Sequence, residues 1–121
     1  MGSTLNPTPE EKIAAARMRL GELAEKFIER TRGEIEAMRG SLGRLGAPDG
    51  VALGEILHLA HRISGTGATL GFESVSERAR RVEQLATAQT PGSSCDTATI
   101  EMLRTGIEAL AAEVATAATK R

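Results

Sequence analysis

The sequence predicts an all-α protein, folded as an antiparallel up-down four-helix bundle. The first observation is composition, because only 2% of the 121 residues are aromatic and neither Trp nor Tyr occurs. Ala, Leu, Glu and Arg dominate instead, and these are strong helix formers, whereas β folds draw on β-branched and aromatic residues. The second observation is that Gly- and Pro-containing clusters divide the chain into four segments with helical apolar spacing. Short connections between such segments make neighbouring helices antiparallel.

The first predicted helix begins at Pro9, where Thr8 can cap the helix and Glu11 can complete a capping box. Gly21 and Gly33 are candidate points for a kink or an early break. Apolar or small side chains recur mostly every three, four or seven residues, so we expect one buried face. That face comprises Ile13, Leu20, Ala24, Phe27, Thr31, Ile35, Met38, Leu42 and Leu45. A helix of this length is also a candidate to overhang the bundle and to dimerise.

The remaining helices follow from turn signals. Residues 45–50 form a turn cluster, and the second helix then runs from about Val51 to Leu70, where Gly71 is expected to be a left-handed cap. A third helix is expected over residues 73–88, and residues 90–94 form a loop. The fourth helix is capped by Ser94 or Asp96 and reaches about residue 118. The apolar positions of these last two helices are Val75, Ala79, Val82, Leu85 and Ala86, then Ile100, Leu103, Ile107, Leu110 and Val114.

These boundaries predict a single domain over residues 9–119, a usual size for one hydrophobic core. Residues 1–8 are expected to be a flexible N-terminus, in which Met1-Gly2-Ser3 resembles a cloning remnant. The N-terminus has no signal-peptide pattern, and the lone Cys95 cannot form an internal disulfide. Both features favour a cytoplasmic protein.

Charge and hydropathy exclude several classes of function. The net charge is −1, from 15 basic and 16 acidic residues, and no segment is strongly basic. Nucleic-acid binding is therefore not expected, because it requires a basic surface and, for single strands, aromatic stacking platforms. No apolar run is long enough to cross a membrane. We expect no bound cofactor or metal in this chain.

The second helix has two unlike faces. Its core side combines Ile63 with a stripe of apolar and small residues: Ile56, Leu59, Ala60, Thr66, Gly67 and Leu70. The opposite side presents His58, His61, Gly65 and Ala68, which are small or uncharged. Glycine costs about 1 kcal/mol relative to Ala inside a helix, so we expect each glycine to have a use. Gly67 suits close helix packing, and Gly65 clears space for another protein's surface to reach the imidazole of His61.

A specific pattern follows His61: Gly65 comes four residues later, and Gly71 comes six residues after Gly65. The run that carries it is Ala60-His61-Arg62-Ile63-Ser64-Gly65-Thr66-Gly67-Ala68-Thr69-Leu70-Gly71-Phe72. The pattern continues into the third helix with Val75, Ser76, Ala79 and the pair Val82-Glu83. This sequence resembles the signature of histidine-phosphotransfer (HPt) domains. The specific part of the resemblance covers residues 59–83, and the helix containing Leu20, Leu23 and Phe27 is similar to the first bundle helix of the family.

The resemblance implies that His61 is a phosphorylated nucleophile. It would accept a phosphoryl group from the aspartate of a receiver domain or from a sensor or hybrid histidine kinase, and pass it to a response-regulator receiver. Imidazole suits this role because its reference pKa of about 6.5 leaves a free lone pair near neutral pH. The receiver would bring Mg²⁺. The chain lacks a phosphate-binding GxxxxGK[ST] loop, so it would be a phosphoryl carrier and not an autonomous ATP-dependent kinase.

Other site residues are assigned around His61. Ser64 and Arg62 are the expected phosphate-supporting residues, and His58, Gly65 and Ala68 form the access and docking face. The family usually has Lys where Ser64 stands, so Arg78, Arg80 and Arg81 are further cation candidates.

The missing lysine favours one alternative, a non-catalytic HPt-like interaction module that docks receiver or kinase partners without stable phosphorylation. A metal site on His58 and His61 is the weakest alternative, because no convergent carboxylates lie nearby in the sequence.

Overall fold

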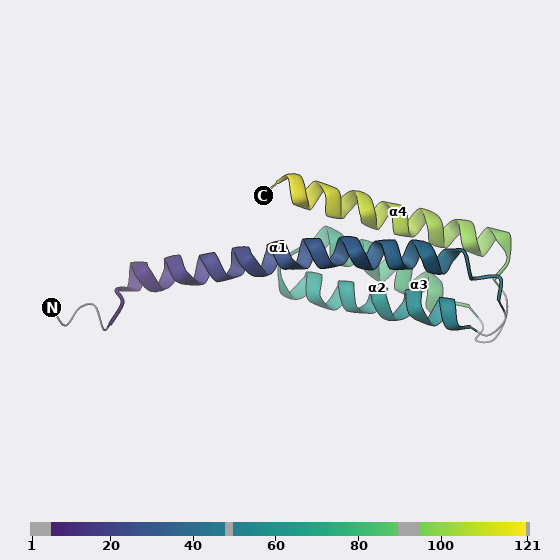
Figure 1. Cartoon of the computed structure of the whole chain (residues 1–121), viewed down its shortest axis with the longest axis horizontal. Coiled ribbons are helices and arrows are strands. Elements are labelled where there is room, and N and C mark those ends of the chain that lie inside the picture. The colour runs from purple at the N-terminus through teal and green to yellow at the C-terminus, as the bar shows by residue number, and fades with distance from the viewer. Residues whose placement is uncertain (1–5, 48–49, 90–94, 121) are drawn as a thin grey trace.

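A computed structural model describes residues 6–47, 50–89 and 95–120. Four helices account for most of them: α1 (Pro9–Leu42), α2 (Val51–Thr69), α3 (Glu73–Thr87) and α4 (Thr97–Thr119). None of the described residues forms a β-strand. Both α1 and α3 pack against α2 and α4, which gives a bundle in which each helix contacts two others (Figure 1). The predicted all-α fold with four helices is confirmed.

The start of α1 has the predicted capping box. The Thr8 hydroxyl accepts a hydrogen bond from the Glu11 N–H at 3.2 Å, and the Thr8 N–H donates to the Glu11 carboxylate at 3.2 Å. The helix continues through Gly21 and Gly33 to Leu42, so the early break considered above does not occur. It ends at Leu42, after which the Gly43 N–H donates a hydrogen bond to the Gly40 carbonyl at 3.2 Å.

The two halves of α1 lie in different environments. The prediction of one buried face along the whole helix is wrong for its first part, since Ile13 and Leu20 are 52% and 59% exposed. The cause is length: the N-terminal part of α1 extends beyond the ends of the other helices (Figure 1). Burial begins at Ala24 and continues through Phe27, Ile28, Thr31, Ile35, Met38 and Leu42.

The core is aliphatic and is supplied by all four helices. Its buried members on the last three helices include Ile56, Ala60, Ile63, Val75, Ala79, Val82, Leu103, Ile107, Leu110 and Val114. Leu85 and Ile100, expected in the core, are only partly buried against it. The two phenylalanines stack on each other, with the rings of Phe27 and Phe72 5.1 Å apart between centroids. They close the end of the core next to the C-terminus of α2.

Local hydrogen bonds fix the helix ends that flank the candidate site. Gly71 has a φ of 84°, as predicted for a left-handed cap, and the Phe72 N–H donates to the Gly67 carbonyl at 2.8 Å. This turn allows α3 to begin directly after α2. Asp96 caps α4 by accepting from the Thr99 N–H at 2.8 Å, and this hydrogen bonding lowers the pKa of the Asp96 carboxyl. Ser94 and the predicted loop at 90–94 lie outside the described residues, as do residues 1–5 and 48–49.

Candidate functional site

The site lies on the exposed face of α2. His58, His61, Gly65 and Ala68 are exposed, and the side chain of His61 is 76% accessible. Residues that alternate with them along the helix are buried in the core: Ile56, Ala60, Ile63 and Gly67. The helix therefore separates into a core face and a face available to another molecule. The prediction that Thr66 belongs to the buried stripe is wrong, because Thr66 is exposed.

Glu83 of α3 holds the imidazole of His61. Its Oε2 lies 2.5 Å from the His61 Nδ1, and the Glu83 side chain is only 25% exposed. Because one ring nitrogen is engaged, the other, Nε2, is left for chemistry with a partner. The sequence matched Glu83 to a family position but assigned it no role. The sequence feature that could have indicated this role is the position of Glu83 directly after Val82, a core residue of α3.

The two glycines near His61 have different surroundings. A Cβ added to Gly65 would meet no atom of another residue within 4 Å, so the space beside His61 is open. A Cβ added to Gly67 would lie 3.4 Å from the Phe27 ring and 3.5 Å from Phe72 and Ser76. Gly67 therefore lies at a close approach of α2 to α1 and α3, as the sequence indicated. Gly65 has no such packing role within the described residues.

Neither expected phosphate-supporting residue is displayed beside the His61 ring. Ser64 is only 7% exposed, and its carbonyl accepts a hydrogen bond from the Ser76 hydroxyl at 2.7 Å, which places it in the contact between α2 and α3. Arg62 is turned toward α1, where its Nε lies 4.0 Å from the Glu34 Oε2. The position one turn after the histidine is therefore covered by α3, and this geometry does not favour a phosphate contact from Ser64.

A charged cluster on the α1 side of the site surrounds Glu34. Burial raises the pKa of the Glu34 carboxyl, and the charges of Arg30 and His58 partly oppose that shift. The Arg30 Nε lies 3.2 Å from the Glu34 Oε1. His58 therefore belongs to the α1 side of the exposed face, whereas His61 turns to α3. Within the described part of the chain, no group of three or more potential ligands could hold a metal ion.

Arginines of α3 differ in their partners. Arg78 lies 3.8 Å from a carboxylate oxygen of Glu113 on α4, so it is directed away from α2. Arg80 is exposed and forms no ion pair with any described residue. It precedes Glu83 by three residues, and residues three apart lie on the same side of a helix. Arg80 is therefore the cation of α3 on the same side as the Glu83 carboxylate that contacts His61.

A family model described as the Hpt domain matches residues 22–113 of the chain. The chain belongs to the Hpt domain family. At the family level, Hpt domains carry out histidine phosphotransfer in phosphorelays and work with receiver domains and kinases of two-component systems. Comparisons with curated proteins and with solved structures returned no match. No helix in the described part of this Hpt domain is long and apolar enough to cross a membrane.

Proposed function

We propose that this Hpt domain is a phosphoryl carrier in which His61 accepts a phosphoryl group from a receiver aspartate or a histidine kinase. It then passes the group to a response-regulator receiver. The observation that carries the proposal is the exposed His61 ring, held by Glu83 and bordered by open space at Gly65. Phosphoryl transfer depends mainly on positioning and charge stabilisation, and an uncluttered helix face meets the first need.

The reacting atom in this proposal is Nε2 of His61. A proton on Nδ1 is donated to the Glu83 carboxylate, which leaves the Nε2 lone pair free to attack phosphorus. The N–P bond forms as the P–O bond of the aspartyl phosphate breaks, and the donor aspartate leaves as a carboxylate. The ring is positively charged while both nitrogens are substituted, so the carboxylate at 2.5 Å stabilises it. The reverse sequence delivers the group to the next aspartate.

Charge on the phosphoryl group needs a cation, and we propose Arg80 for this role. The usual lysine is replaced by Ser64, and Arg62 is engaged with Glu34. Arg80 has no carboxylate partner among the described residues, and its long side chain starts one turn from Glu83. The remaining positive charge, including Mg²⁺, is expected from the receiver. This chain is proposed to need no cofactor of its own.

The proposed arrangement is an antiparallel up-down bundle. Contacts between neighbouring helices support it, because their order along one helix is reversed along the next. Between α2 and α3, His61 contacts Glu83 and Ser64 contacts Ser76. In this direction, Arg80 lies between Ser76 and Glu83 and is therefore opposite the stretch of α2 between Ser64 and His61. We also propose a cytoplasmic location, and a single unpaired cysteine is consistent with a reducing compartment.

A second function is favoured by one observation, the burial of Ser64 where the family usually has lysine. In that case the domain docks a receiver or kinase without being phosphorylated. Docking without transfer would need the same exposed face of α2 but would not need the His61 lone pair.

The test mixes the protein with receivers from the same genome that have been phosphorylated by acetyl phosphate, followed by intact mass spectrometry. The carrier proposal predicts one phosphoryl group on wild type, lost in acid and retained in base. His61→Gln should remove it, and His58→Gln, on the same face, is the matched control that should retain it. Arg80→Gln should slow the gain about tenfold, whereas Arg78→Gln should not. Binding of a receiver without any mass gain would support the interaction module instead.

A further inference from the structure

The projecting part of α1, residues 9–23, carries an apolar stripe that no described residue covers. The stripe consists of Ile13, Ala16, Leu20 and Leu23, all of which are exposed. Its spacing of three, four and three residues continues to Phe27, where the same stripe enters the core. Such spacing is that of a coiled-coil seam, which packs against another helix. At about 1.5 Å per residue the projection is about 22 Å long.

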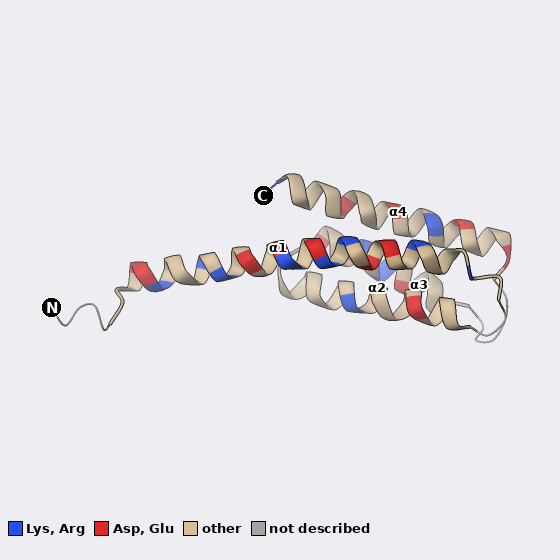
Figure 2. Cartoon of the chain, viewed as in Figure 1, with Lys and Arg blue, Asp and Glu red and all other residues tan. Residues whose placement is uncertain are grey.

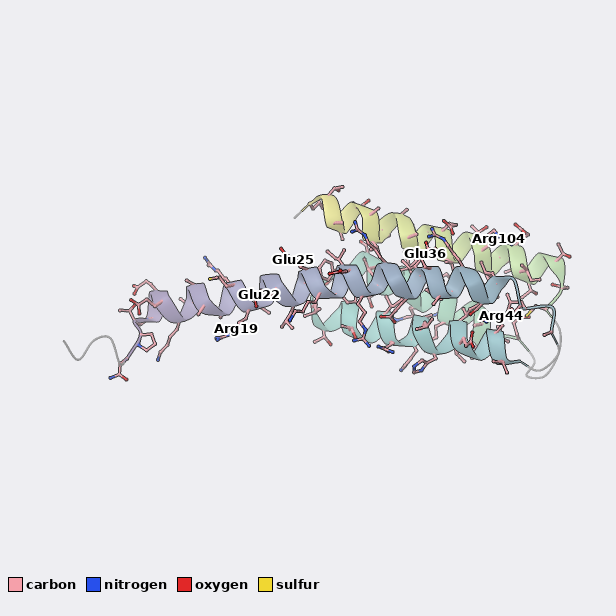
Figure 3. All side chains as sticks on the ribbon, viewed as in Figure 1. Arg19, Glu22, Glu25, Glu36, Arg44 and Arg104 are labelled. Atoms are coloured by element: carbon pink, nitrogen blue, oxygen red, sulfur yellow. The ribbon has the colours of Figure 1, made fainter. Side chains whose placement is uncertain are left out.

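Basic and acidic side chains lie on different sides of the helix around this stripe. Lys12, Arg19 and Lys26 recur every seven residues, each immediately before a seam residue, and form a basic ridge along one flank. Carboxylates such as Glu11 and Glu22 lie on the other sides of the helix, so both signs occur along the projection (Figure 2). Arg19 and Glu25 point away from α1 in different directions (Figure 3). None of the three ridge cations pairs with a carboxylate in the described part of the chain.

The ridge leads into a groove between α1 and α2. The groove has a volume of about 260 Å³ and is lined by apolar side chains, by Lys26, and by Glu34 with its two partners Arg30 and Arg62. It starts at Leu23, the last exposed residue of the stripe. Stripe, ridge and groove therefore make one continuous surface, apolar along its centre and basic along its edge. His61 turns instead to α3, so this surface is separate from the phosphoryl-accepting face.

A second copy of the chain fits this surface poorly. In a parallel pair, Lys12 would face Arg17 of the second copy, and in an antiparallel pair the basic ridges would face each other. Like charges beside a seam disfavour the pairing. An acidic flank on a partner helix would instead meet all three ridge cations. The charge pattern therefore selects a partner of opposite sign.

We propose that the projecting part of α1, together with the α1–α2 groove, binds an amphipathic helix of another protein whose apolar stripe is flanked by Glu or Asp. Most of the projection precedes the family match, which begins at residue 22. The projection therefore lies mostly outside the matched Hpt domain, whereas the groove lies within it. The binding surface gives the carrier a means to be held near one partner while His61 remains available to another.

The test uses two labelled three-heptad peptides with the same leucine seam, flanked by Glu in one and by Lys in the other. Fluorescence anisotropy with the full chain should give at least tenfold tighter binding of the Glu peptide. The triple variant Lys12→Glu, Arg19→Glu, Lys26→Glu should reverse this preference. A triple variant with the same charge change, Arg32→Glu, Arg104→Glu, Lys120→Glu, should keep it. Circular dichroism confirms that each variant is folded, and phosphorylation of His61 should be unchanged in both.

Three results would overturn the proposal. One is equal binding, or no binding, of the two peptides. The second is a preference for the Glu peptide that persists in the Lys12, Arg19, Lys26 variant. The third is dimerisation of wild type in sedimentation that Leu20→Glu abolishes, because a second copy would then be the occupant. A loss of His61 phosphorylation with peptide binding intact would count only against the carrier function.

Discussion

Two glycines of α2, Gly65 and Gly67, lie two positions apart and serve opposite faces. Gly67 is where α2 approaches Phe27, Phe72 and Ser76 within ordinary contact distance of a Cβ. Gly65 has open space in front of it, next to an exposed His61. The same residue type, glycine, therefore permits close packing at position 67 and access to His61 at position 65. The comparison teaches that changes to the core face should alter folding, whereas changes to the exposed face should alter transfer alone.

The largest effect is expected on the core face. Ile63→Ala removes a side chain that is 1% exposed and leaves a cavity in the hydrophobic core. It should lower the free energy of unfolding by about 2–5 kcal/mol. Urea denaturation monitored by circular dichroism measures this. Phosphotransfer by the fraction that remains folded should be normal, and a specific loss of transfer would contradict the separation of the faces.

The next effect is confined to the exposed face. Gly65→Gln places a side chain in the open space beside His61 and should slow transfer from a phosphorylated receiver about a hundredfold, because misplacement of reacting groups has that order of cost. Stability should not fall, since glycine is the poorer helix former by up to about 1 kcal/mol. Ala68→Gln, one turn further from the ring, is the control for a general crowding effect. Normal transfer by the Gly65 variant would refute the access argument.

Gly67→Leu should have the opposite signature. The added side chain would overlap Phe27 and Ser76, and overpacking of this kind costs about 1–3 kcal/mol of stability. Gly67→Ala should be close to neutral, because its Cβ would make ordinary contacts. Thermal unfolding of the two variants against wild type measures the difference. Equal stability of the Leu variant and wild type would mean that α2 is not closely packed at this point.

Glu83→Gln is expected to have a smaller effect on transfer and almost none on folding. The amide can still accept the hydrogen bond from the ring but cannot stabilise its positive charge, so phosphorylation should slow about tenfold, or about 1.4 kcal/mol in the barrier. Glu77→Gln, an exposed change on the same helix, serves as the control. Quench-flow measurements of the phosphotransfer rate compare the Glu83 and Glu77 variants. Equal rates for the two variants would remove Glu83 from the mechanism.

The sequence predicted features that depend on local patterns. The capping box at Thr8, the left-handed Gly71, the cap at Asp96 and the starts of the helices all follow from neighbouring residues. The core face of α2 followed from periodicity except at Thr66, which is exposed, and at Leu59 and Leu70, which are only partly buried. These features require no knowledge of what lies across the bundle.

The rest depends on tertiary geometry. Burial of Ile13 and Leu20 could not be judged, because it depends on where the other helices end relative to α1. The contact of Glu83 with His61 and the burial of Ser64 both depend on the register of α3 against α2. Periodicity within one helix does not determine that register.

The most direct test of the central claim identifies which nitrogen carries the phosphoryl group. Wild type phosphorylated by a receiver and labelled with ¹⁵N can be studied by ³¹P and ¹⁵N NMR, which distinguish the two phosphohistidine isomers. We predict phosphorus on Nε2 of His61, with the proton of Nδ1 retained in its hydrogen bond to Glu83. Phosphorus on Nδ1, or on His58, would contradict the account.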